Sequence, residues 1–230
     1  MEKVFVLLVS EGEMPFLSSV EGAFGYGRPG GTPTIAFSYA NFSSTSGLSL
    51  VNTSSIISNQ IYITTAANNL VGNVYRSTAI PYNRNFTFTW NFECSGGTSP
   101  PADGFCLQWT TTNTTNGGGG GGVGYLTTAV QAFLFKTYTN NSFTWLANNV
   151  QQFTQGSQNF YRDLFYWADY NYSTSTMSIY FATTNTKPAL PNFTLTGFVF
   201  DSTPYYIGFG AATGGANENH ILKSMTLTFG

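Results

Sequence analysis

Few side chains in this sequence could act as acids, bases or nucleophiles. A glycosidase needs two carboxylates about 5 to 10 Å apart, supplied by alternate positions of one strand or by two facing strands. Only Glu11 and Glu13 stand two residues apart, and they precede the segments that predict strands. We therefore predict that the protein is not an enzyme. The ten carboxylates are Glu2, Glu11, Glu13, Glu21, Glu93, Glu218, Asp103, Asp163, Asp169 and Asp201.

The other reactive side chains do not indicate a catalytic or metal centre. His220 is the only histidine, and no Gly-X-Ser-X-Gly motif is present to expose a nucleophilic serine. Histidine, cysteine and aspartate do not occur at the spacings typical of metal ligands. The sequence thus predicts no catalytic residue, no bound metal and no other cofactor.

Four polar or glycine-rich motifs do follow one another in a fixed order. The first is Ala-Asp-Gly at residues 102–104, and the second is the glycine run at 117–122. An apolar segment at 130–140 then ends in Thr-Tyr-Thr-Asn, and residues 206–215 read Tyr-Ile-Gly-Phe-Gly-Ala-Ala-Thr-Gly-Gly, followed by His220. Such residues could bind a ligand if the fold brought the motifs together.

The elements that would position these motifs are β-strands. Apolar and polar residues alternate along residues 86–92, 177–181 and 225–229, the period of a strand with one buried face. Turn-forming clusters stand between the strands, at residues 95–98, 140–142, 171–173 and 214–217. No segment of useful length has helical spacing. The pattern predicts an all-β antiparallel sandwich or barrel.

The order of the four motifs resembles the L-type (legume-like) lectin family over about residues 34–229. That family has an Ala-Asp-Gly strand start, a glycine-rich loop, a strand ending in Thr-aromatic-X-Asn, and a C-terminal Gly-Phe-X-Ala-X-Thr-Gly followed by histidine. The resemblance implies a concanavalin A-like jelly roll, an antiparallel β-sandwich, at residues 34–230.

The resemblance also implies a shallow sugar site formed by four loops. Asp103 would accept hydrogen bonds from sugar hydroxyls, Tyr138 would stack on the pyranose ring, and Asn140 would donate its amide. The loop residues would offer backbone N–H groups that no side chain covers. The implied carbohydrate-binding residues are Asp103, Gly121, Gly122, Tyr138, Asn140, Gly215 and Ala216.

Each of these residues also has a simpler interpretation. Asp103 before Gly104 suits a turn, and the glycine run at 117–122 suits a flexible tether. Tyr138 could be a core residue, and Asn140 a turn residue or a glycan acceptor.

The sequence departs from the family where the lectins bind metal. Related lectins carry Glu-X-Asp before Thr-aromatic-X-Asn, and these carboxylates hold a transition metal and calcium. Here the positions are Leu134 and Lys136, and the next acidic position is Thr144. Calcium needs six or more oxygen ligands, so we predict neither calcium nor manganese. We interpret Lys136 as a built-in cation whose ammonium hydrogen-bonds Asp103 and Asn140.

Composition limits the partners. The eight Lys and Arg residues are spread thinly and the formal net charge is −2, so nucleic acid is not expected. The longest apolar run, residues 4–9, is far shorter than the roughly 20 residues of a membrane-spanning helix. This run resembles a short signal peptide but favours a strand, and residues 1–33 read as an N-terminal arm.

The cysteines and asparagines bear on the compartment. Cys94 and Cys106 flank a loop and could form a disulfide or be two small core residues. Seven Asn-X-Ser/Thr sequons suit a secreted glycoprotein, although an Asn- and Thr-rich chain also generates sequons by chance. They begin at Asn41, Asn52, Asn85, Asn113, Asn140, Asn171 and Asn192.

The predicted function is metal-independent, non-catalytic glycan binding on an extracellular, cell or virion surface. The alternative is a structural protein of a virion or filament, in which residues 4–9 add a strand to a neighbouring copy.

Overall fold

The structure is a computed structural model that describes residues 32–138 and 141–230. The predicted arm at residues 1–33 lies almost wholly outside this range, as does Asn140. The strand expected at residues 4–9, the self-association assigned to it and the domain boundary at residue 33 therefore remain predictions. The described chain begins its first strand at Thr34 and ends its last at Phe229.

One of two sheets, sheet I, contains both of these terminal strands. Its strands are β1 (Thr34–Tyr39), β3 (Ser55–Ile57), β4 (Gln60–Thr64), β7 (Phe86–Ser95), β12 (Asp163–Asn171), β13 (Thr176–Ala182), β14 (Phe193–Thr196) and β16 (Asn219–Phe229). Their order is β14-β13-β12-β7-β16-β4-β3, and β1 also pairs with β16.

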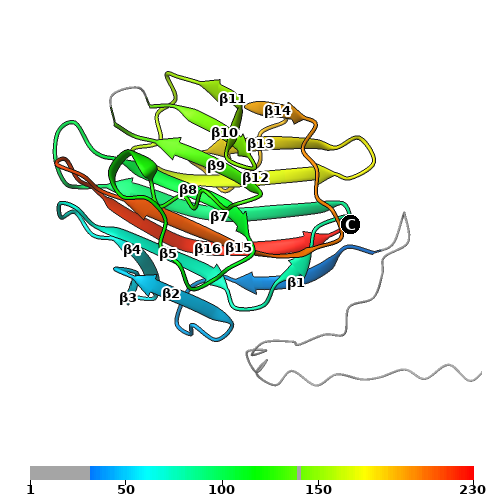
Figure 1. The fold of residues 1–230 in the computed structure, drawn as a ribbon, viewed down its shortest axis with the longest axis horizontal. Helices are drawn as coiled ribbons and strands as arrows, with labels where there is room; N and C mark the ends of the chain where they lie inside the picture. The colour runs from blue at the N-terminus through cyan, green and yellow to red at the C-terminus, as the bar shows by residue number, and fades with distance from the viewer. Residues whose placement is uncertain (1–31, 139–140) are drawn as a thin grey trace, which may run out of the picture.

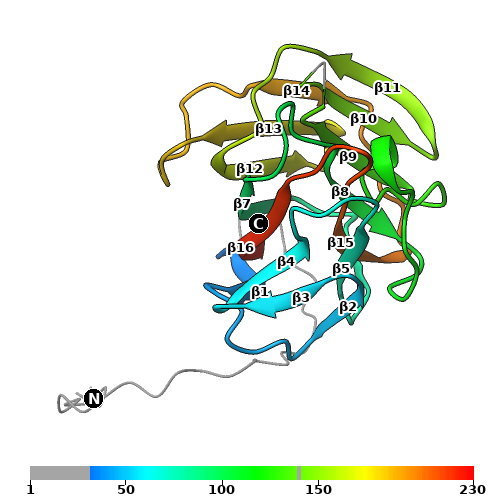
Figure 2. The same ribbon diagram turned by 90° about the vertical axis from the view of Figure 1, so that its left-hand side faces the viewer.

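The second sheet, sheet II, lies against the first (Figure 2). Its strands are β2 (Leu48–Asn52), β5 (Val71–Arg76), β6 (Ile80–Pro81), β8 (Gly104–Thr110), β9 (Gln131–Lys136), β10 (Phe143–Ala147), β11 (Val150–Gln155) and β15 (Pro204–Ala212). Their order is β11-β10-β9-β8-β15-β5-β2, and β6 also pairs with β15. The sole helical element of the described residues is a 3₁₀ turn, η1, at Gly120–Gly122.

All strand pairs that the structure describes are antiparallel, and the two layers form an all-β sandwich (Figure 1). The predicted fold class is therefore confirmed. The three alternating segments fall in β7, β13 and β16. In β7 the aromatic residues Phe86, Phe88, Trp90 and Phe92 are buried, because successive side chains of a strand point to opposite faces.

Aromatic rings from the inner faces of both sheets fill the core. The ring of Phe92 in sheet I stacks on Phe105 in sheet II, with centroids 3.8 Å apart, and Phe105 stacks on Phe135 at 4.5 Å. Trp90 stacks on Tyr166 within sheet I at 4.9 Å. Large buried rings contribute strongly to stability through the apolar area they remove from water.

The two cysteines are separate buried thiols in the structure. Cys94 lies on β7 and packs in the core between the sheets. Cys106 lies on β8 and belongs to a second apolar cluster with Tyr75 and Leu134. The structure favours the interpretation of both as core residues, since the thiols belong to different apolar clusters.

The long connection from β8 to β9 covers this second cluster. Val123, Tyr125, Leu126 and Ala129 of the connection pack against residues of sheet II that face away from the main core. The connection thereby forms a small third layer and carries η1 with it. No helix of the described residues is long and apolar enough to cross a membrane.

The stacking of Phe92 on Phe105 predicts a large loss of stability when one of the two rings is removed. Phe105→Ala should lower the free energy of unfolding by about 3–5 kcal/mol, because it removes a buried ring and leaves a cavity between the sheets. Urea unfolding followed by tryptophan fluorescence measures this. The control Val150→Ala, at an exposed position of edge strand β11, should change stability by no more than about 0.5 kcal/mol. A similar small loss for both variants would contradict the packing argument.

Candidate functional site

Three loops meet at one end of the sandwich, beside the carboxylate of Asp103. They are the β7–β8 loop, the glycine loop (residues 117–124) and the β15–β16 loop. A Cβ atom placed on Gly214 would lie 3.0 Å from Asp103 Oδ2, and one placed on Gly120 would lie 3.8 Å from it. The structure thus brings together three of the four motifs, at the end that Figure 2 presents to the viewer.

Backbone contacts fix Asp103 in place. The Asp103 N–H donates to the carbonyl of Ala212 (3.0 Å), and the Asp103 carbonyl accepts from the N–H of Thr137 (3.1 Å). The Ala102–Asp103 peptide is cis. Gly104 has φ = 121°, and a Cβ atom there would lie 2.1 Å from the Phe135 carbonyl oxygen. Glycine is therefore required at position 104, where β8 begins. The close approach of the Phe135 backbone explains this glycine without a turn at Asp103-Gly104.

The Asp103 carboxylate is held in a largely dry position. Its side chain belongs to a residue only 9% exposed, and Oδ2 is buried without a hydrogen-bond partner. Burial raises the pKa of this carboxyl group. The nearby His220 opposes the increase, the Glu218 carboxylate adds to it, and the Lys136 ammonium opposes it. An oxygen in this state gains a full hydrogen bond from any donor that reaches it.

The glycine loop has a defined conformation, so the tether interpretation is wrong. The N–H of Gly118 donates to the Tyr125 carbonyl (2.9 Å), and the N–H of Gly124 donates to the Gly118 carbonyl (2.9 Å). Two buried amide side chains of sheet II hold the loop. Asn73 accepts from the Gly117 N–H (3.0 Å) and donates to the Gly124 carbonyl (2.8 Å), and Gln108 donates to the same carbonyl (3.2 Å).

The glycines expected to bind sugar have open space beside their Cα atoms. Gly121, Gly122 and Gly215 have nothing within 4 Å of the position of a Cβ atom, but the Gly122 N–H already donates to the Gly119 carbonyl (3.0 Å) and is not free for a ligand. Ala216 turns its carbonyl inward, where it accepts from the Gly214 N–H (3.0 Å). These positions give a ligand space to approach the main chain.

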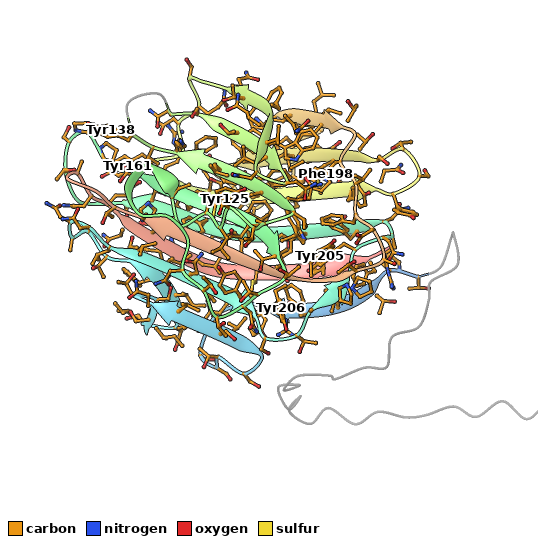
Figure 3. The ribbon with its side chains drawn as sticks, viewed as in Figure 1. Tyr125, Tyr138, Tyr161, Phe198, Tyr205 and Tyr206 are labelled. Carbon is orange, nitrogen blue, oxygen red and sulfur yellow. The ribbon has the colours of Figure 1, made fainter. Side chains whose placement is uncertain are left out.

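Tyr138 is 44% exposed, so the core interpretation does not hold for this residue. It directly follows Thr137, whose N–H is bound to Asp103. Figure 3 places Tyr138 at the same end of the sandwich as Tyr161, whose hydroxyl donates to the Gly96 carbonyl (2.8 Å) in the β7–β8 loop. Asn140, expected two residues further on, is outside the described residues.

Lys136 differs from its expected role. Asp103 Oδ2 has no hydrogen-bond partner, so the predicted hydrogen bond from the Lys136 ammonium is not formed at this oxygen. Lys136 stands opposite Gly104 in the β8–β9 register, and its charge favours the ionised form of Asp103 from a distance. The interaction of Lys136 with Asp103 at Oδ2 is thus electrostatic and does not involve a hydrogen bond.

The divalent metals implied by the lectin resemblance do not fit this site. Leu134 packs in the second apolar cluster, and the Thr144 hydroxyl is hydrogen-bonded to that of Thr154 (3.0 Å). A calcium ion needs several oxygen ligands, and an apolar side chain and an ammonium at two of the positions cannot provide them.

A buried polar chain lies behind Asp103, which sequence spacing did not indicate. His220 Nδ1 is hydrogen-bonded to Thr64 Oγ1 (2.6 Å), and His220 Nε2 lies 3.0 Å from Glu218 Oε1. The Thr137 hydroxyl also donates to Glu218 Oε1. Hydroxyl, imidazole and carboxylate stand in the order of a hydrolase triad, but Thr64 is fully buried and no substrate could reach it.

A second correction concerns paired carboxylates. Glu93 on β7 and Asp163 on β12 are directly opposite each other in sheet I, a cross-strand pair that the search along single strands missed. Both carboxylates bind the ammonium of Lys223, and Asn91 donates to Asp163 Oδ1 (2.6 Å). The two carboxylates are thus part of an ion-pair cluster on the surface of sheet I.

The fold is similar to those of several solved lectins and lectin-like proteins. The structure is similar to the VIP36 exoplasmic/lumenal domain bound to Ca²⁺ and Man3GlcNAc, with 18% identity, a TM-score of 0.70 and coverage of 83% of this chain and 86% of that one. It is similar to basic winged bean lectin with Tn-antigen (19% identity, TM-score 0.69, 86% and 98% covered). Arcelin-5, a lectin-like defense protein from Phaseolus vulgaris, is 17% identical with a TM-score of 0.69 and the same coverage.

No protein-family model and no curated protein matches the sequence. The structural similarities show that the chain has the L-type, legume-lectin-like fold that the four motifs predicted.

Because Asp103 is buried with a raised pKa, its contribution to the free energy of unfolding should depend on pH. A carboxyl group whose folded pKa is raised costs stability as pH rises from its usual pKa, 3.8, through the raised value. Asp103→Asn removes this cost, so the variant should gain stability relative to the natural protein over that range and keep the gain above it. Urea unfolding at a series of pH values measures the difference.

Asp201→Asn is the matched control with the opposite sign. Hydrogen bonds from Tyr205 and Thr203 lower the pKa of Asp201, so its ionised form adds stability that is lost as pH falls through the lowered pKa. This variant should become less stable than the natural protein as pH rises. The same pH slope for both variants would refute the assignment of Asp103.

Proposed function

We propose that the loop end of the sandwich binds carbohydrate without a divalent metal and without catalysis. The observation that carries this proposal is the unpartnered, buried Oδ2 of Asp103, which faces Gly120 and Gly214. Sugars present hydroxyl donors in pairs, and a carboxylate provides two acceptor oxygens in one plane. Oδ2 is closed to solvent in the structure, so a sugar hydroxyl reaches it only when the Gly120 or Gly214 backbone moves aside. The hydroxyl then supplies the hydrogen bond that the protein does not.

The surrounding residues supply the other contacts of a sugar site. The exposed ring of Tyr138 offers a flat apolar face to a pyranose ring. The open backbones of Gly121, Gly122 and Gly215 allow close approach. Asn140, and the loop backbone at Ala216, are assigned to the site by their positions in the sequence.

The proposed site needs no metal because protein groups already hold its parts. Thr137 and Ala212 bind the Asp103 backbone, and Asn73 and Gln108 bind the glycine loop. The charge of Lys136 supplies a part of the positive potential that a cation would provide. Preformed loops lower the entropy cost of binding.

The same geometry supports a non-catalytic role. A glycosidase needs a second carboxylate facing the same sugar bond. Glu218, the carboxylate whose charge acts on Asp103, is fully buried. The chemistry available at the loop end is hydrogen bonding and stacking. The structurally similar proteins include lectins in complex with Tn-antigen and with GalNAc, and a domain with bound Man3GlcNAc, so these are the first ligand classes to test.

Binding should fail when either the acceptor or the stacking face is removed. Asp103→Asn should weaken glycan binding about tenfold or more, since a hydrogen bond to a charged group contributes about 1.5–3 kcal/mol. Tyr138→Ala and Asn140→Ala should also weaken it, and a chelator should have no effect. A glycan array followed by titration calorimetry with mannose and GalNAc glycans measures these changes.

Tyr172→Ala is the control for the tyrosine variant. Tyr172 is 47% exposed, and it follows β12 at the opposite end of the sandwich, so its loss should leave binding unchanged. An array without signal at high protein concentration, or Asp103→Asn binding as well as the natural protein, would exclude this site.

We also propose that the protein acts outside the cell or on an exposed surface. Five of the sequon asparagines are exposed, namely Asn41, Asn52, Asn85, Asn171 and Asn192. They are accessible to the glycosylation machinery of a secretory route. Intact mass spectrometry of protein from its native source should show N-glycans at some of these positions, and an amidase should remove them and leave an aspartate in place of each modified asparagine. An unmodified mass would argue for another route.

A further inference from the structure

The polar chain behind Asp103 arises from the register of three neighbouring strands of sheet I. His220 at the start of β16 is paired with Cys94 on β7 and with Thr64 on β4. Residues directly opposite each other on antiparallel strands have Cβ atoms about 4.5–5.5 Å apart. Glu218 stands two residues before His220, close to the same face. The three residues Cys94, Glu218 and His220 thereby meet inside the protein.

The potential ligand atoms of these residues are close together and shielded from water. The Cys94 sulfur, a Glu218 carboxylate oxygen and a His220 ring nitrogen all lie within 4.8 Å of one another. Cys94 is 1% exposed, and Glu218 and His220 are fully buried. Thiolate, imidazole and carboxylate are the three kinds of side chain that bind zinc in proteins.

Two threonines orient the histidine and the glutamate. The Thr64 hydroxyl is bound to His220 Nδ1 (2.6 Å), which fixes the ring and directs Nε2 toward Glu218. The Thr137 hydroxyl donates to Glu218 Oε1, which leaves the other carboxylate oxygen available. Metal-binding histidines usually have their second nitrogen held in this way by a neighbouring polar group.

An independent feature points to a missing ligand. Glu218 Oε2 is buried and has no hydrogen-bond partner. A buried carboxylate oxygen without a partner costs free energy, because water no longer solvates it. The Cys94 thiol lies nearby but is not hydrogen-bonded to this oxygen, so it does not remove the cost.

From this geometry we propose that Cys94, Glu218 and His220 form a buried zinc site between β7 and β16. A zinc ion there binds the Cys94 thiolate, Glu218 Oε2 and His220 Nε2, and a water molecule completes the four ligands. The two anionic ligands balance the charge of Zn²⁺, so the buried site is neutral. Zinc displaces the proton of the Cys94 thiol to solvent, and His220 binds through Nε2 as the neutral ring whose Nδ1–H donates to the Thr64 hydroxyl.

Zinc fits this ligand set better than the other common divalent ions. Calcium and magnesium prefer oxygen ligands in larger number, whereas the site combines sulfur, nitrogen and oxygen. The ligands come from strand β7, from the first residues of strand β16 and from the residue just before it, so the ion joins two strands beneath the loop end. This inference does not depend on carbohydrate binding. Because the site is fully buried, the ion enters during folding.

The test is refolding of the full chain with zinc, followed by removal of free ion and measurement of bound metal by mass spectrometry. The natural protein should retain about one zinc per chain, and its urea unfolding midpoint should be higher than after refolding with a chelator. Refolding with Co²⁺ should give the absorption band of a cobalt–thiolate bond. The variant Cys94→Ala should lose the ion, the midpoint increase and the band.

Cys106→Ala is the matched control, because Cys106 is also a buried free thiol but lies on β8, in the second apolar cluster. It should keep the zinc and the cobalt–thiolate band. Thr64→Val tests the orienting hydroxyl without removing a ligand, and it should weaken zinc binding by about 10- to 100-fold in a chelator competition.

Each outcome decides the proposal. Zinc retained equally by Cys94→Ala would overturn it, and so would a natural protein that refolds to the same midpoint with zinc as with chelator. If Cys94→Ala does not fold, the cobalt–thiolate band of the natural protein and its persistence in Cys106→Ala still decide whether Cys94 binds the ion. A natural protein that retains zinc but binds no glycan would contradict the proposed sugar site and leave the zinc site standing.

Discussion

The stacking of Phe92 on Phe105 is the contact on which the loop end of the sandwich depends. The two rings join the sheets at a centroid distance of 3.8 Å. Cys94 follows Phe92 by two residues on β7, and Asp103 precedes Phe105 by two at the start of β8. The ring pair therefore sets the separation between the polar chain in sheet I and the carboxylate that precedes the central strand β8 of sheet II. Apolar packing of this kind is rigid, because protein interiors are close-packed.

The buried polar groups at this end of the molecule are of two kinds. The amides of Asn73 and Gln108 bind main-chain groups of the glycine loop and of Leu126. By contrast, Asp103 and Glu218 each have one buried oxygen without a partner. Satisfied amides stabilise the loop, whereas an unsatisfied carboxylate oxygen has a free energy cost that a bound ligand would offset. The satisfied amides of Asn73 and Gln108 are structural residues of the loop end, whereas Asp103 and Glu218 are the residues that we propose bind ligands.

The sequence predicted the fold and part of the site, for identifiable reasons. Alternation along β7, β13 and β16 indicates one buried face, and Gly104 marks a backbone position that excludes a side chain. Register between distant strands has no such local signal. For this reason the pairing of Cys94 with His220 and the anchoring of the glycine loop by Asn73 were not predicted. The direction of a long flexible side chain such as Lys136 is likewise set by its surroundings.

The change at position 134 explains how the glycine loop is held without metal. In the lectins that the motifs resemble, this strand position carries an acidic metal ligand. Leu134 instead packs with Val123, Tyr125 and Leu126 of the β8–β9 connection. Burying a leucine side chain contributes about 1.5–3 kcal/mol, and the cluster contains several such side chains. Apolar packing thus fastens the connection to sheet II, and the buried amides set its final position. With the loop fixed in this way, Gly120 lies beside Asp103 whether or not a cation is bound, and this makes a metal-independent sugar site physically consistent.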